Sequence, residues 1–283
     1  MSSVSDHPLA TLRRLRISTS LLCGGLIVLA AVAIALFPQL FATFDPDAFD
    51  YDALLASPSA QHWFGTDSFG RDIYSRVIWA FRIDIQIALF ATIFSVIFGT
   101  LMGAIVGFFG GPLDAIIGRI IDVVVIFPFL VLIIAVVALL GPGLANMYIA
   151  MTAVGWVFYC RLMRGEIRLL KNLDYAAAAR GLGYGDMRII LRHLLPNAIT
   201  PVLIYWMTDM ALAVLLGSSL GYLGLGAQPP QAEWGVLIAD GKNYIETAWW
   251  MSVFPGLAIL LLGLGLSMLG DGLAEYFDRQ ERA

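Results

Sequence analysis

The sequence predicts an all-α polytopic membrane protein with six transmembrane helices and both termini in the cytoplasm. The first observation is composition: 59% of the 283 residues are apolar and 13% are charged, whereas a soluble domain averages about 45–50% and about 25%. The second is that Asp, Glu, Lys and Arg are absent from four long windows, 17–44, 85–113, 123–160 and 247–270. The third is that Lys and Arg concentrate in alternate loops.

Glycine and proline residues divide the apolar windows into six predicted spans. A helix needs about 20 apolar residues to cross the hydrocarbon core of a bilayer. Pro38 ends the first span, the turn 110–112 ends the second, and the Gly-Pro-Gly turn 141–143 separates the third from the fourth. Pro128 is expected to kink the third span, because proline frees a backbone carbonyl. The predicted spans are 19–37, 84–108, 118–140, 144–163, 198–220 and 250–269.

The distribution of Lys and Arg predicts the orientation of these spans. If the termini are cytoplasmic, 13 of the 17 Lys and Arg residues lie on the cytoplasmic side and 4 on the other. Short loops rich in Lys and Arg stay in the cytoplasm. The predicted regions are a cytoplasmic tail 1–18, a transmembrane domain 19–269 with extracytoplasmic loops 38–82 and 221–249 and a cytoplasmic loop 161–196, and a cytoplasmic tail 270–283.

Three glycines of the second predicted span recur at every fourth position. Gly99, Gly103 and Gly107 share one face of a helix, and small residues at this spacing let another helix approach closely. We interpret the stripe as a helix-packing surface and assign no chemistry to it.

Asp209 is the one ionisable residue well inside a predicted span. Such a residue costs roughly 2.5–3.5 kcal/mol at the centre of a helix on insertion scales, so an interaction must offset this cost. One interpretation places Asp209 on the substrate path, where it receives a peptide amino terminus or a metal cation. The other is a structural carboxyl, either protonated or hydrogen-bonded to a helix of a partner subunit.

The cytoplasmic segment 174–196 is predicted to form a helix–turn–helix elbow. Four alanines after Asp174 favour a first helix, three glycines between 181 and 185 break it, and Asp186 can cap a second short helix that Pro196 ends. A short helix with an apolar face suits a groove on a partner protein. A basic helix also suits the anionic headgroups of a bilayer, and the residues alone leave both interpretations open.

The same segment resembles the EAA signature of permease subunits in binding-protein-dependent ATP-binding-cassette importers. That signature is Glu-Ala-Ala, three residues, Gly, nine residues, an apolar residue, any residue, then Leu-Pro. Here the alanines 177–179 are followed at the same spacing by Gly183 and by the closing run 193–196. Two positions depart, because Ala177 replaces the frequent Glu and His193 replaces an apolar residue. The Arg-His-x-Leu-Pro-Asn ending is typical of the dipeptide, oligopeptide and nickel permease branch.

Further motifs of that branch follow one another along residues 60–275, and together they imply the six-helix fold called MetI-like. They are Gly65-Thr66-Asp67-Ser68-Phe69-Gly70-Arg71-Asp72, Phe108-Phe109-Gly110-Gly111, Leu223-Gly224-Leu225-Gly226, Glu233-Trp234-Gly235, Pro255-Gly256 and Leu269-Gly270-Asp271. The resemblance also implies that the elbow couples the chain to an ATPase. The implied coupling residues are Ala177, Ala178, Ala179, Arg180, Gly183, Arg188, Arg192, Leu195 and Pro196.

The resemblance implies the partners as well. The chain has no Gly-x-x-x-x-Gly-Lys-Ser/Thr phosphate loop, so ATP and Mg²⁺ are expected in two separate ATPase subunits, with no cofactor and no catalysis on this chain. A second permease subunit, forming a heterodimer, and an extracytoplasmic substrate-binding protein complete the expected assembly. We expect this assembly to lie in a bacterial cytoplasmic (inner) membrane, in contact with its lipids. The net charge of −4 argues against a nucleic-acid partner.

Import of dipeptides or oligopeptides is the leading expectation, with nickel or another small solute of the same branch as the alternative. His7, His62 and His193 lie in different loops or tails and form no metal-ligand pattern. A secondary transporter is less expected, because no inverted repeat is evident and only Asp209 is a deep charge. An intramembrane enzyme would need a nucleophile–base or metal constellation that is not visible, and a scaffold would leave the elbow unexplained.

Overall fold

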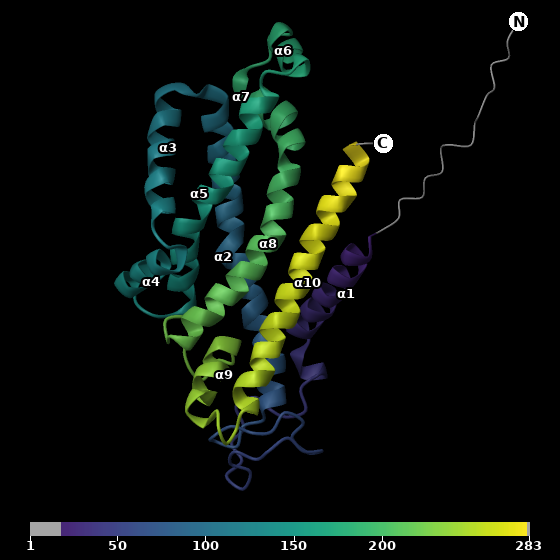
Figure 1. Cartoon of the computed structure of the whole chain (residues 1–283), viewed down its shortest axis with the longest axis vertical. Helices are drawn as coiled ribbons and strands as arrows, with labels where there is room; N and C mark the ends of the chain where they lie inside the picture. Colours follow the sequence, from purple (N-terminus) through teal and green to yellow (C-terminus); the bar gives the residue numbers. More distant parts are fainter. Residues whose placement is uncertain (1–17, 282–283) are drawn as a thin grey trace, which may run out of the picture.

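The computed structural model describes residues 18–281, and every regular element in this range is a helix (Figure 1). Most of the predicted tail 1–18 and the end of the tail 270–283 lie outside the described residues. The long helices are α1 (Thr19–Leu36), α2 (Ile73–Phe109), α5 (Leu144–Leu170), α8 (Leu195–Tyr222) and α10 (Trp250–Glu281). The shorter ones are α3 (Gly111–Ile126), α4 (Phe129–Leu140), α6 (Asp174–Gly181), α7 (Asp186–Ile189) and α9 (Trp234–Gly241).

The number of membrane spans is only partly settled by these helices. Four helical segments of the described chain are long and apolar enough to cross a membrane, namely Thr19–Leu36, Ile73–Phe109, Asp186–Tyr222 and Trp250–Asp278. The pair α3 and α4 passes the same test when it is taken as one bent span, which raises the number to five. The chain is therefore an all-helical membrane protein with four or five candidate spans. α5 has sufficient length, at 27 residues, but is less apolar.

The second long helix begins earlier than the sequence predicts. α2 starts at Ile73 rather than at 84, because the Asp72 carboxylate accepts a hydrogen bond from the backbone N–H of Ser75 at 2.8 Å and caps the helix. The predicted extracytoplasmic loop 38–82 is correspondingly shorter, since its last residues are helical.

The third predicted span, 118–140, is not a single kinked helix. It is divided between α3 and α4, whose axes are bent by 95° at the break (Figure 1). Pro128 is the physical reason: proline lacks an N–H and forces the preceding residue out of the helical region. Phe127 accordingly has φ −81° and ψ 142°, which are extended values.

The predicted stop at Pro196 is also wrong. Helical structure continues from Asp186 through a π-helical turn, Ile190–Leu194, into α8. Pro196 lies in the first turn of α8, where a missing N–H costs little. The elbow is thus directly continuous with the fifth predicted span, and the only non-helical residues between α5 and this long helical segment flank α6.

The glycine stripe of α2 lies against the backbone of α5. A Cβ atom added to Gly103 would lie 2.5 Å from the carbonyl oxygen of Cys160, and one added to Gly107 would lie 2.8 Å from that of Arg164. Gly99 meets the preceding turn of α5 in the same way. The two helices therefore pack backbone to backbone, and side chains larger than hydrogen are excluded at these positions.

We expect Gly103→Ala to destabilise the fold, because its methyl group would overlap the α5 backbone and force the two helices apart. The matched control is Gly263→Ala on α10, where a Cβ meets no atom within 4 Å and alanine favours the helix by up to about 1 kcal/mol. Thermal unfolding of the detergent-solubilised chain should show a melting temperature several degrees lower for the first variant only. Equal melting temperatures would contradict the close packing.

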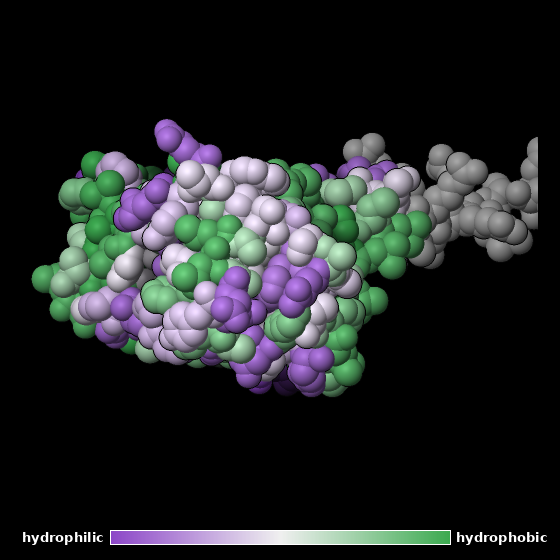
Figure 2. Space-filling view, turned by 90° about the horizontal axis from the view of Figure 1, so that it is seen from below, coloured by the Kyte–Doolittle hydropathy of each residue, from purple (hydrophilic) through white to green (hydrophobic). Residues whose placement is uncertain are grey.

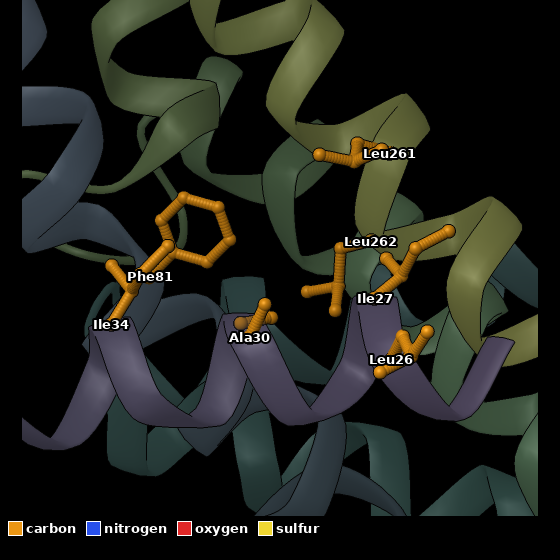
Figure 3. Close-up of a pocket in the computed structure, with 8 residues that line it drawn as sticks. Leu26, Ile27, Ala30, Ile34, Phe81, Leu261 and Leu262 are labelled. Carbon is orange, nitrogen blue, oxygen red and sulfur yellow. The ribbon is translucent and has the colours of Figure 1, made fainter. Parts of the chain in front are cut away.

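α1 packs on α10 and encloses an apolar cavity with it. Gly24 lies so close to α10 that an added Cβ would be 2.8 Å from the carbonyl oxygen of Gly265. Farther along, a cavity of about 260 Å³ separates the helices, and Phe81 of α2 lines it from a third side (Figure 3). All eight lining side chains are apolar. This cavity supplies no polar group for a hydrophilic substrate, and we place no transport site in it.

Candidate functional site

The elbow, residues 174–196, lies at one end of the molecule, above α5 and α8 in Figure 1. Part of its apolar surface points into the protein, because Ala176, Ile189, Ile190 and Leu194 are fully buried. They join a core cluster with side chains from the halves of α5 and α8 that are nearest the elbow. The elbow is therefore anchored to both helices, and its buried face is not available to a partner.

The turn between α6 and α7 is a Schellman motif, which explains the requirement for glycine. Gly183 has φ +77°, a left-handed conformation that glycine adopts without strain. Its N–H donates to the carbonyl of Arg180 at 2.9 Å, and the N–H of Tyr184 donates to that of Ala179 at 3.3 Å. These two bonds end α6 and set the angle of the elbow.

Most of the predicted coupling residues lie on the outer surface of the elbow. Ala179 is buried and Leu195 is half-buried, so these two hold the elbow rather than face outwards. The Arg188 guanidinium lies over the ring of Tyr184, 4.2 Å from its centroid. The exposed coupling residues are Ala177, Ala178, Arg180, Gly183, Arg188, Arg192 and Pro196. They share their surface with the exposed apolar side chains of Leu182, Met187 and Leu191.

Asp209 forms a hydrogen bond inside the helix bundle. The hydroxyl of Tyr159 on α5 donates to Oδ2 of Asp209 on α8 at 2.6 Å. Tyr159 is fully buried, and its ring meets that of Tyr205 edge-on at 5.0 Å between centroids. A cavity of only about 10 Å³, which also touches Thr92 and Ser95, borders the carboxyl. Nothing in the sequence identified Tyr159 as the partner, because a tyrosine within an apolar run has no distinguishing pattern.

A larger cavity, of about 680 Å³, lies beside the half of α5 that is nearest the elbow. Tyr205 contributes its only lining side chain from α8. Two charged groups of this wall, Arg161 and Glu166, have no ion pair or hydrogen bond within the described part of the chain. The lining residues are Phe158, Arg161, Leu162, Gly165, Glu166, Arg168, Leu169 and Tyr205.

The opposite end of the molecule is held together by buried acidic side chains. Glu233 accepts the N–H groups of Gly235 at 2.7 Å and Val236 at 3.0 Å, which caps α9. Asp84 of α2 accepts the N–H of Trp234 and the hydroxyl of Ser218, both at 3.3 Å. Burial raises the pKa of Glu233. The Glu-Trp-Gly motif thus ties α9 to α2 and α8.

The loop before α2 is ordered by further ion pairs. Arg71 pairs with Asp67 at 2.6 Å and with Asp240 of α9 at 3.5 Å, and Nδ1 of His62 lies 2.9 Å from Asp72. Burial raises the pKa of Asp240. Figure 2, which views this end of the molecule, shows hydrophilic residues gathered on the surface with apolar residues around them. This end of the molecule therefore carries a folded polar surface.

No group of three or more His, Cys, Asp and Glu side chains with metal-binding geometry occurs among residues 18–281. His62 and His193 lie in separate parts of the fold, at Asp72 and beside Tyr184 respectively. Among the described residues, Cys23 and Cys160 are both free thiols. The features of the described chain that could serve a function are therefore the packed helices, the anchored elbow and the cavity that contains charged side chains.

Comparison with known proteins bears directly on this arrangement. Residues 95–283 match the family model described as "Binding-protein-dependent transport system inner membrane component". This match covers more than half of the chain and includes the elbow, Asp209 and the Glu-Trp-Gly motif.

Individual relatives are similar over nearly the whole length. The probable D,D-dipeptide transport system permease protein DdpC of Escherichia coli (strain K12) is 39% identical over 90% of this chain and 86% of its own. The dipeptide transport system permease protein DppC of Alkalihalophilus pseudofirmus is 38% identical over 90% of this chain and 84% of its own length. The glutathione transport system permease protein GsiD of Escherichia coli O157:H7 is 40% identical over 94% of this chain and 88% of its own length.

Proposed function

This chain belongs to the family of binding-protein-dependent transport system inner membrane components, and from that premise we propose that it forms half of an import pathway for small peptides. It is a non-catalytic permease subunit of an ATP-binding-cassette importer in the inner membrane. The relatives transport a D,D-dipeptide, dipeptides and glutathione according to their names. These cargoes share a small peptide backbone with charged ends, which supports the same class of cargo here over nickel.

The observation that supports coupling is the anchoring of the elbow. Its buried side chains join α5 to α8, while its outer face carries arginines and exposed apolar residues. In our proposal this outer face docks on an ATPase subunit, and movement of the docked elbow tilts α5 and α8 as rigid bodies. ATP and Mg²⁺ reside in two such ATPase subunits, and this chain holds neither.

The proposed membrane arrangement has six spans with both termini in the cytoplasm. It takes α1, α2, the bent pair α3–α4, α5, α8 and α10 as the spans, so α5 is the addition to the five candidates. The distribution of Lys and Arg supports this orientation. A second permease subunit completes the pathway, and a substrate-binding protein docks on the polar end that carries α9.

The test of the proposed function is co-purification followed by transport. The tagged chain, isolated from native membranes, should carry ATPase subunits with it. Proteoliposomes containing that complex and its binding protein should accumulate a labelled dipeptide only when ATP is present. Isolation of the chain without any ATPase, under conditions that retain the second permease subunit, would contradict the proposal.

We also propose that Asp209 lies on the substrate path and meets the amino terminus of the passing peptide. Its carboxyl is deep in the bundle and is held by one hydrogen bond, from Tyr159, that a stronger cationic partner can replace. We expect Asp209→Asn to lower peptide uptake at least tenfold at an unchanged level of protein in the membrane. Tyr159→Phe, which removes only the hydrogen bond, should have a smaller effect. Unchanged uptake by Asp209→Asn would remove Asp209 from the path.

A further inference from the structure

The cavity beside the cytoplasmic half of α5 contains charges that the fold leaves unneutralised. Three arginines lie close together on this helix, and two of them serve α3: Arg164 and Arg168 both donate to the carboxylate of Asp114. Arg161 lines the cavity and has no such partner among residues 18–281. Packing of α3 against α5 therefore accounts for two of the arginines and leaves the third without an ion pair in the described chain.

Glu166 is a second charge on the same wall, and among residues 18–281 it forms no ion pair. It is five residues from Arg161, so the two side chains line the cavity from opposite edges of one face of α5, too far around the helix to pair with each other. The middle of the wall is open, because a Cβ added to Gly165 would meet no atom within 4 Å. Apolar side chains, Phe158, Leu162 and Leu169, line much of the rest.

These features match the recognition of a small zwitterion. A volume of about 680 Å³ falls within the roughly 300–1,000 Å³ of small-molecule sites, which are mostly apolar with a few polar groups that fix orientation. A guanidinium binds a carboxylate in two-point geometry, and a carboxylate accepts from an ammonium group. One ligand with both ends charged would satisfy Arg161 and Glu166 together.

We infer that this cavity is a cytoplasm-side binding station for the transported peptide, with its carboxylate on Arg161 and its ammonium group on Glu166. The inference rests on the proposed import function and adds the residues of a second station to it. Tyr205 lines the cavity from α8, and its ring contacts that of Tyr159, the partner of Asp209. The pair of rings thus connects Asp209 to this station.

The position of the cavity connects it to the elbow. It is lined from α5 and α8, the two helices that the elbow joins. In the proposed cycle, a tilt of these helices changes the separation of Tyr205 from the α5 wall. The station would accordingly be open in the conformation described here and would release its peptide to the cytoplasm.

Equilibrium binding to the assembled complex tests the station directly. The complex of this chain with its second permease and ATPase subunits is reconstituted in nanodiscs without the binding protein, and radiolabelled alanyl-alanine, its N-acetyl form and its C-terminal amide are the probes. Arg161→Gln should weaken dialanine binding about tenfold and abolish the preference over the amide. Glu166→Gln should weaken dialanine binding to a similar extent and abolish the preference for dialanine over its N-acetyl form. Arg119→Gln, an exposed cation on α3 outside the cavity, is the control.

Several outcomes would overturn the inference. They are no measurable binding of dialanine by the complex, equal binding of all three probes, or unchanged binding in both cavity variants. Retention of ATPase subunits and ATP hydrolysis are measured on the same samples. If these persist while dialanine binding is lost or absent, the result concerns the station alone and leaves the proposed import function in place.

Accessibility of the cavity wall provides a second measurement. Gly165→Cys, in a chain whose Cys23 and Cys160 are replaced by alanine, should react with a water-soluble methanethiosulfonate reagent in the assembled complex. Dialanine should slow this reaction, and the amide should slow it less. A cysteine that reacts in the isolated chain but not in the complex would show that a partner subunit covers this wall, which would also overturn the inference.

Discussion

Gly183→Pro is expected to abolish ATP-driven uptake while the chain still inserts and assembles in the membrane. Proline holds φ near −65°, whereas Gly183 has φ +77° and donates its N–H to the carbonyl of Arg180. The substitution therefore removes the Schellman motif and changes the angle between α6 and α7. Uptake of a labelled dipeptide by proteoliposomes should fall at least tenfold. ATP hydrolysis by the complex should continue without stimulation by the binding protein.

Gly185→Pro is the matched control for this prediction. Gly185 has φ −67°, which proline adopts, and its N–H donates no backbone hydrogen bond within the described residues. Uptake by this variant should stay close to that of the unmodified chain. A complex in which Gly183→Pro transports as fast as Gly185→Pro would show that the shape of the elbow does not matter for coupling.

Glu233→Ala is expected to destabilise the end of the molecule that carries α9. It leaves the buried N–H groups of Gly235 and Val236 without acceptors, and each such group costs about 1–3 kcal/mol. We expect a loss of roughly 2–4 kcal/mol in the free energy of unfolding. With an unfolding entropy of about 2.1 cal/mol/K for each of the 283 residues, that corresponds to a melting temperature lower by about 3–7 °C. Thermal unfolding of the detergent-solubilised chain measures this change in melting temperature.

Two further variants make the result on Glu233 specific. Glu246→Ala removes an exposed carboxylate from the same loop region and should leave the melting temperature nearly unchanged. Glu233→Gln keeps one oxygen as an acceptor and should lie between the two alanine variants. If Glu233→Ala and Glu246→Ala melt together, the cap on α9 does not stabilise the chain as the hydrogen bonds indicate.

The sequence predicted the class of fold because hydrophobic runs and loop charges are local properties. The windows without charged residues correspond to real helices. Window 17–44 contains α1, for example, and window 247–270 contains the first part of α10. The comparisons confirm the predicted family. The third span was wrong in its middle, where the chain breaks at Pro128, and the other errors occurred at helix ends. The Asp72 cap that extends α2 and the course of the chain through Pro196 depend on hydrogen bonds between neighbouring turns, which apolar periodicity does not report.

What the sequence determined by itself was membership in a helical membrane class, the basic segment that forms the elbow and the isolation of Asp209. The tertiary structure decided which groups meet. It paired Asp209 with Tyr159, fifty positions away, and buried the apolar face of the elbow that the sequence left open for a partner. It also engaged Arg164 and Arg168 but not Arg161. The physical reason is that hydrogen bonds and ion pairs depend on atoms a few ångströms apart in space, whatever their separation along the chain.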